Sequence, residues 1–151
     1  MNHNIPVAGE GFSIELKDNC ATIKVGEYLN RFQCSKEDEE TLLHMMNVIA
    51  NSSGLYGTDI IDFECVFEQC TNHRFVTYSI RESDEDFSFI TQSETKAAVL
   101  FVVGSNTMGL SDVNKIIKKI VERYSTDAAI IFTAEISEKI DDGYYLLCIL
   151  E

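Results

Sequence analysis

The fold of this chain is decided by residues 97–151, which read AAVLFVVGSNTMGLSDVNKIIKKIVERYSTDAAIIFTAEISEKIDDGYYLLCILE. The run from Ala97 to Val103 is wholly apolar and stops at Gly104, as a buried strand does. Apolar residues then recur at helical spacing and predict a helix with one buried face; they are Val113, Ile116, Ile117, Ile120, Val121 and Tyr124. Two more apolar runs follow, at 128–136 and 144–150, and an acidic turn of hairpin composition separates them. The stretch therefore predicts strand, helix, strand, strand.

The residues before this stretch predict a hairpin, two helices and one more strand. Polar and apolar residues alternate in 12–16 and 21–25, which favours a β-hairpin around Asp18 and Asn19. A capping-box pattern at Ser35 opens a helix, and helical spacing resumes near Asp59. Residues from Arg74 to Ile80 read as a strand, and residues 82–96 read as a loop with a short element of uncertain type.

These elements predict an α+β fold. We expect a mixed sheet of about four core strands covered by helices, with an N-terminal β-hairpin. Residues 1–34 form the tail and hairpin, and residues 35–151 form the main domain. At 151 residues and 45% hydrophobic composition, the chain is large and apolar enough to make one compact unit with a proper core.

Composition excludes several classes of function. The net charge of -13 argues against binding to nucleic acid or to anionic membranes, because both need a basic surface. No apolar run approaches the roughly 20 residues of a membrane-spanning helix, and the N-terminus lacks a signal-peptide pattern. We therefore expect a cytoplasmic protein that binds neither nucleic acid nor membrane.

The five cysteines point to reduced thiols. Their number is odd and none forms a C-x-x-C pair, so the sequence indicates neither a disulfide framework nor a zinc site. Cys148 lies within an apolar strand, where a small buried residue is the ordinary interpretation. The three histidines lie on separate segments. We expect no metal and no cofactor.

From about Glu37 onward the chain resembles the central helix and C-terminal domain of the FtsZ/tubulin family. The resemblance rests on an ordered set of motifs: Ala97 to Asn106, Leu110 to Ile117, Asp127 to Phe132, and Ile140 to Ile149. The segment from Ile61 to Val66 is similar to the stretch that joins the family's central helix to its C-terminal domain. The resemblance implies the fold given above, without the family's GTP-binding domain.

Two departures from the family bear on activity. A phosphate-binding loop needs clustered glycines, and residues 1–34 hold only Gly9, Gly11 and Gly26. The family's activating motif, N-x-D-x-x-D, falls on Ile60, Asp62 and Cys65, so only Asp62 survives. The resemblance therefore implies no GTPase activity and no catalytic residues.

These observations favour a non-enzymatic protein-interaction module: a stand-alone domain that binds a filament-forming relative or its own copy. One alternative is a small enzyme in which Cys34, His44, Cys70 and His73 converge, because a thiolate nucleophile needs a neighbouring base. Another alternative is an acidic protein that mimics a nucleic acid.

The predicted partner-binding residues are Tyr56, Thr58, Asp59 and Asp62. The resemblance implies that the loop after the central helix faces a neighbouring subunit, and Tyr56 lies there between Gly54 and Gly57. Tyrosine often anchors interfaces. A competing interpretation is that Asp59 and Asp62 only stabilise the start of a helix.

Overall fold

The computed structural model describes residues 3–6, 12–51, 60–90 and 95–151, and for 3–6, 51, 60–62 and 84 it describes the backbone only. Two four-stranded sheets and three α-helices make up the described chain. The first sheet contains β1 (His3–Pro6), β2 (Phe12–Lys17), β3 (Cys20–Val25) and β4 (Tyr28–Gln33). The second contains β5 (Phe75–Arg81), β6 (Ala97–Gly104), β7 (Ala129–Ile136) and β8 (Tyr144–Leu150). We call them sheet A and sheet B.

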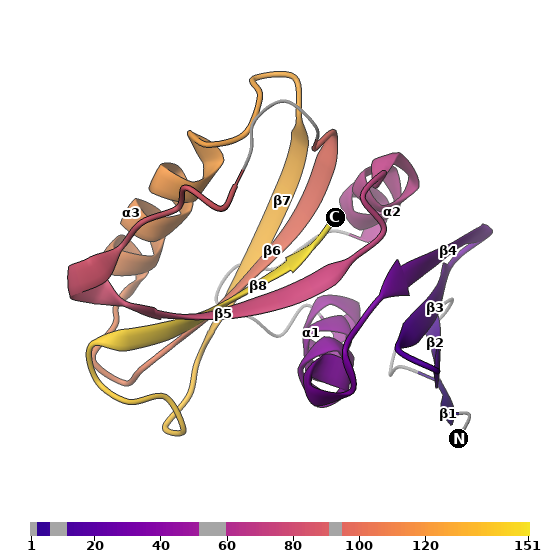
Figure 1. The fold of residues 1–151 in the computed structure, drawn as a ribbon, viewed down its shortest axis with the longest axis horizontal. Coiled ribbons are helices and arrows are strands. Elements are labelled where there is room, and N and C mark those ends of the chain that lie inside the picture. The colour runs from indigo at the N-terminus through magenta and orange to yellow at the C-terminus, as the bar shows by residue number, and fades with distance from the viewer. Residues whose placement is uncertain (1–2, 7–11, 52–59, 91–94) are drawn as a thin grey trace.

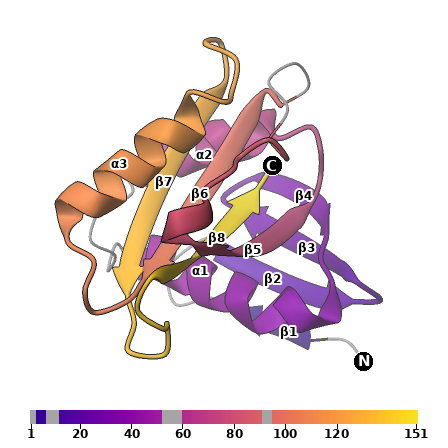
Figure 2. The ribbon, with the colours of Figure 1, turned by 60° about the vertical axis from the view of Figure 1, so that its left-hand side comes forward.

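The helices lie on both sides of sheet B. A 3₁₀ turn, η1 (Lys36–Asp38), leads into α1 (Glu39–Asn51), and α2 is Ile60–Gln69. Figure 1 shows α1 and α2 between the two sheets and α3 (Leu110–Val121) on the far face of sheet B. Figure 2 shows the same order from another side. The layers are therefore α3, sheet B, α1 with α2, and sheet A.

Sheet B is the mixed sheet that the sequence predicts. Its strand order is β5-β8-β6-β7, with β6 and β7 parallel and the other pairs antiparallel. All eight residues of β6 are buried, because helices cover both faces at the centre of the sheet. The predicted strands and α3 are confirmed, and Ile116, Ile117, Ile120 and Tyr124 of and after α3 are buried as expected.

Sheet A is larger than the predicted hairpin. The hairpin itself is confirmed as β2 and β3, whose turn residues Asp18 and Asn19 both have positive φ, as a two-residue hairpin turn requires. Two more strands, β1 and β4, extend it to the order β1-β2-β3-β4. Sequence reasoning missed β4 because only Phe32 of its six residues is buried, so alternation is weak.

One apolar core joins sheet A to sheet B. It contains the inner residues of sheet A, the facing sides of α1 and α2, and one face of sheet B. A second core lies between the other face of sheet B and α3. The predicted boundary at residue 34 stays a prediction, although residues on both sides of it share the first core.

The start of the first helix differs from the predicted capping box. Ser35 donates its hydroxyl hydrogen to the Asp38 carboxylate at 3.0 Å, and its side chain caps no backbone N–H. Asp38 also accepts a hydrogen bond from Thr77 of β5 at 2.8 Å. The serine therefore orients an acid that ties η1 to sheet B, an interaction that local spacing cannot reveal.

Candidate functional site

The predicted docking loop lies outside the part of the chain that the structure describes. Tyr56, Thr58 and Asp59 fall in 52–59, and Asp62 lies in α2 where only the backbone is described. Their role in binding a partner stays a prediction.

The four residues of the predicted thiol enzyme have separate partners. Cys34 donates to the Ser35 carbonyl at 3.5 Å, and Cys70 donates to the Val66 carbonyl at 3.4 Å. His44 contacts Glu135 at 2.6 Å, and His73 contacts the Arg31 carbonyl at 3.2 Å. None of the hydrogen bonds among the described residues joins a thiol to an imidazole, so the structure does not bring these four residues together.

Burial also keeps the inner thiols protonated. It raises the pKa of Cys34 and of Cys70 to about 12, with nearby carboxylates adding to the effect. Burial raises the pKa of Cys148 as well. A thiol with such a pKa is not a thiolate at neutral pH, so none of these three is an activated nucleophile.

Alkylation of the native protein is expected to label Cys65 and to spare Cys148. Cys65 is exposed on α2, whereas Cys148 is 0% exposed in β8 between β5 and β6. All five cysteines are free thiols, so unfolding should make all of them reactive. Iodoacetamide labelling followed by peptide mass spectrometry measures this, and the exposed Cys65 is the internal control. Fast labelling of native Cys148 would contradict the buried position of β8.

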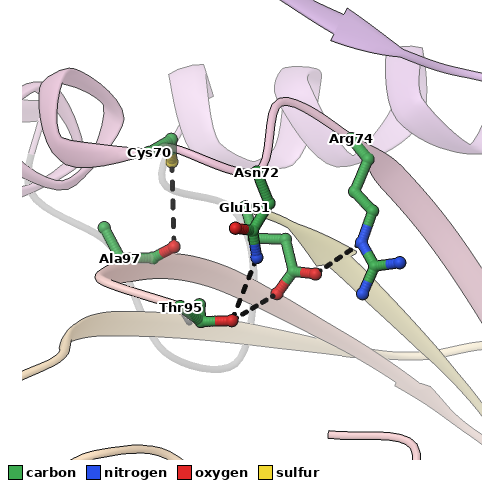
Figure 3. Close-up of polar contacts among 6 residues, drawn as sticks. All are labelled: Cys70, Asn72, Arg74, Thr95, Ala97 and Glu151. Atoms are coloured by element: carbon green, nitrogen blue, oxygen red, sulfur yellow. Dashed lines mark hydrogen bonds and ion pairs between the residues drawn. The ribbon is translucent and has the colours of Figure 1, made fainter. Parts of the chain in front are cut away.

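A polar cluster brings distant segments together around Glu151 (Figure 3). The Glu151 side chain is 4% exposed, and its carboxylate accepts a 2.6 Å bond from Nε of Arg74. The Thr95 hydroxyl donates to the same carboxylate at 3.5 Å, and the Asn72 amide donates to Thr95 at 3.0 Å. Cys70 lies beside this group and contacts the Ala97 carbonyl at 4.0 Å.

This cluster connects the start of β5 to the end of β8, and the space beside it is too small for a substrate. The backbones of Arg74 and Glu151 exchange two hydrogen bonds of 3.0 Å, which continues the pairing of β5 with β8. The adjoining cavity measures about 10 Å³, near the lower limit for one water molecule. Tyr124 lines this cavity, and its buried hydroxyl has no hydrogen-bond partner among the described residues, so one water could satisfy it. The described residues contain no group of three or more His, Cys, Asp or Glu side chains that could hold a metal ion.

Two hollows among the described residues lie beside β5, the edge strand of sheet B. One measures about 500 Å³ and the other about 280 Å³. We call them the loop hollow and the turn hollow, because η2 (Glu82–Asp84) and its following loop border the first and the turn between β7 and β8 borders the second. Ser79 and Tyr144 line both, so the two hollows adjoin. The loop hollow is also lined by Tyr78, Ile80, Arg81, Asp86 and Phe89, and the turn hollow by Lys139, Ile140, Asp141, Tyr145 and Leu146.

Aromatic contacts shape the walls of these hollows. The rings of Tyr78 and Phe89 stack at 4.1 Å between centroids, and the guanidinium of Arg81 lies 6.0 Å from the ring of Tyr144. Tyr145 donates to Glu85 at 3.1 Å, which fixes the loop after η2 against sheet B. Sequence reasoning did not find this surface, because it depends on which strand ends up at the edge of the sheet.

Comparison with known proteins identifies the fold. No family model matches the sequence, and no curated protein matches it. Among solved structures, the chain is similar to an empty FtsZ dimer from M. jannaschii, with a TM-score of 0.56 and 18% identity. The W319Y mutant of the same FtsZ gives a TM-score of 0.54 and 17% identity. CetZ from Methanosaeta thermophila strain DSM 6194 is more distant, with a TM-score of 0.42, 14% identity, and 74% of this chain and 34% of CetZ covered.

The likeness to FtsZ confirms the fold that the sequence resemblance implies. Each FtsZ match covers 76% of this chain, and the chain spans 38% to 39% of the FtsZ length. The protein therefore has a tubulin-like α+β fold that corresponds to part of FtsZ, as expected for a C-terminal-domain-like unit.

Proposed function

We propose that this protein is a non-enzymatic interaction module of the FtsZ-like cytoskeleton, which binds a filament-forming relative or its own copy. The observation that carries the proposal is the fold, which matches FtsZ over 76% of the chain. One of the matched structures is described as an FtsZ dimer, so that protein associates with itself. The proposed contact is made by residues between α1 and α2 and at the start of α2: Tyr56, Thr58, Asp59 and Asp62.

The thiol chemistry supports a role without catalysis. The alternative enzyme needs a thiolate beside a base, whereas Cys34 and Cys70 are buried, protonated and bonded to backbone carbonyls. The sparse glycines of residues 1–34 likewise support a protein that does not bind GTP. A module that only binds other proteins fits both observations.

The surface charges disfavour mimicry of a nucleic acid. Three exposed lysines lie along α3, at positions 115, 118 and 119, and interrupt the acidic surface. A phosphate-backbone mimic needs a continuous row of negative charge.

The cytoplasm is the compartment we propose. Five free thiols are stable where glutathione keeps cysteines reduced. In the described part of the chain, no helix has the length and apolar character needed to span a bilayer.

The Tyr56→Ala variant is expected to weaken association by more than about 1 kcal/mol, about fivefold in Kd, without changing thermal stability. The measurement is sedimentation velocity of the protein alone and mixed with an FtsZ-like protein from the same cell, with and without GTP. Tyr28→Ala is the matched control, because Tyr28 is a 38% exposed tyrosine on β4. Normal association of Tyr56→Ala, or its unfolding, would reject this loop as the contact. Absence of any association at micromolar concentration would reject the proposed function.

A further inference from the structure

The open edge of β5 has the geometry of a peptide-binding site. We propose that an extended, basic peptide of a partner protein binds there as an additional strand of sheet B, with side chains in the loop hollow and the turn hollow. This proposal rests on the proposed function, since it names a second surface and a class of partner for the same interaction module.

The hydrogen-bond pattern leaves part of the β5 backbone available. The residues that flank β5 direct their backbone groups toward the β8 side. Arg74 exchanges backbone bonds with Glu151, and the Glu82 N–H donates to the Gly143 carbonyl. Because alternate residues of an antiparallel strand direct their N–H and C=O groups to opposite sides, Ser79 and Arg81 direct theirs outward. No hydrogen bond among the described residues reaches those outward groups. A strand laid beside β5 would therefore find two residues that can each exchange a pair of backbone bonds.

The other parts of the β5 edge are already in use. The first residues of the strand lie beside sheet A, where Gln33 forms a bridge with Arg74 and donates to the His73 carbonyl at 2.7 Å. The Thr77 hydroxyl donates to Asp38, so η1 lies beside the strand at this position. The open segment is thus 78–81, and this segment contributes residues to both hollows.

The two hollows match the side-chain pattern of an added strand. Side chains of a strand point alternately to the two faces of its sheet. Tyr78 and Ile80 point to the α3 face, where their neighbours belong to the second core, and both line the loop hollow. Ser79 points to the opposite face, as does Leu146, its partner on β8, and both line the turn hollow. The loop hollow reaches round the edge of the strand, because Ser79 and Arg81 also line it. Successive side chains of a bound peptide would therefore point alternately to the α3 face, into the loop hollow, and to the opposite face, where the loop hollow adjoins the turn hollow.

Charge selects a basic partner over a second copy of this chain. The loop after β5 carries Glu82 and Asp86, and the turn before β8 carries Glu138, Asp141 and Asp142, against Arg81 and Lys139. Glu85 of the same loop is already paired with Lys119 of α3 at 3.6 Å. Antiparallel pairing of β5 with β5 of a second copy would place the acids of both copies at the two ends of a segment of only four residues, and like charges in an interface cost affinity. Both acidic groups flank the Arg81 end of the open segment, because Arg81 pairs with Tyr144 and Glu82 bonds to Gly143. A peptide with lysine or arginine beside its apolar centre would find opposite charge at that end.

The test uses a fluorescent peptide with four alternating aromatic and aliphatic residues at its centre and two lysines at each end. Fluorescence anisotropy should show saturable binding to the full chain. A peptide of the same sequence with alternate N-methylated amides keeps the charge and side chains but cannot pair as a strand. It should bind at least about tenfold more weakly.

Two protein variants test the same edge from the other side. Ser79→Pro removes a backbone N–H that points away from the sheet, and it breaks no hydrogen bond to β8. Proline is tolerated at such positions of an edge strand. It should keep the circular dichroism of the wild type and lose at least about tenfold in peptide affinity. Tyr144→Ala removes the side chain that lines both hollows and should weaken peptide binding similarly. Its fold should be preserved, because Tyr144 is 38% exposed and contributes little to the core. Leu29→Ala, at a 61% exposed position of sheet A, is the matched control and should bind normally.

The results of these experiments distinguish peptide binding at the β5 edge from the contact proposed at Tyr56. Equal binding of the N-methylated peptide, or unchanged binding by Tyr144→Ala and folded Ser79→Pro, would overturn the edge proposal. The edge proposal would also be overturned if Ser79→Pro abolished self-association while no peptide bound. The β5 edge would then bind a second copy of this chain. Failure of the peptide to bind would also overturn the edge proposal. It would leave the Tyr56 experiment untouched, so the two proposals can fail independently.

Discussion

Phe67→Ala is expected to lower the free energy of unfolding by about 3–5 kcal/mol, the usual cost of removing a fully buried ring. Phe67 is 0% exposed on α2. Its ring centroid lies 5.6 Å from that of Phe32 in β4 and 5.8 Å from that of Phe63, and Phe63 lies 5.7 Å from Phe12 in β2. This row of rings connects α2 to sheet A, so the cavity opens in the core that both sheets share.

The location of the cavity also predicts how the variant unfolds. Because sheet A and sheet B share that core, both should be lost in one transition, as in small single domains. Urea titration followed by circular dichroism and by tyrosine fluorescence measures this. Phe67→Leu should cost less than half as much, and Leu29→Ala should stay within about 0.5 kcal/mol of wild type. A loss below about 1 kcal/mol for Phe67→Ala, or separate transitions for the two probes, would contradict a shared core.

Arg74→Met is expected to cost about 2–3 kcal/mol of unfolding free energy. The substitution removes the guanidinium but keeps a side chain of similar length, and it leaves the Glu151 carboxylate buried at 4% exposure with only Thr95 as a weak donor. Losing one partner of a fully buried ion pair costs about 3–5 kcal/mol. The Arg74 side chain is 46% exposed, so water screens part of the interaction and lowers the expected loss.

A second substitution separates the unpaired charge from the loss of packing. Glu151→Gln replaces the carboxylate by a neutral amide, so Arg74→Met combined with Glu151→Gln should be more stable than Arg74→Met alone. Thermal unfolding of the wild type, both single variants and the double variant gives the coupling between the two side chains. Additive losses would mean that the 2.6 Å contact contributes no coupling energy, contrary to the role assigned to it.

Local sequence patterns were enough to predict the strands of sheet B and the helix α3. The runs that form β6, β7 and β8 are long and apolar, and the spacing of Val113, Ile116, Ile117 and Ile120 fits only a helix with one buried face. The β2–β3 hairpin was also predictable, because alternation and turn residues are local signals. These patterns indicate which side chains of a segment are buried, and they can be read from that segment's own residues.

Other features depend on neighbours far away in the chain and became visible only in the three-dimensional structure. β4 is a strand because β3 pairs with it and because Asn30 bonds to the Phe67 carbonyl, although its own alternation is weak. Glu151 is buried because Arg74 and Thr95 meet it there. The open groove exists because β5 lies at the edge of sheet B, and strand order is set by long-range hydrogen bonding and packing that no local pattern contains.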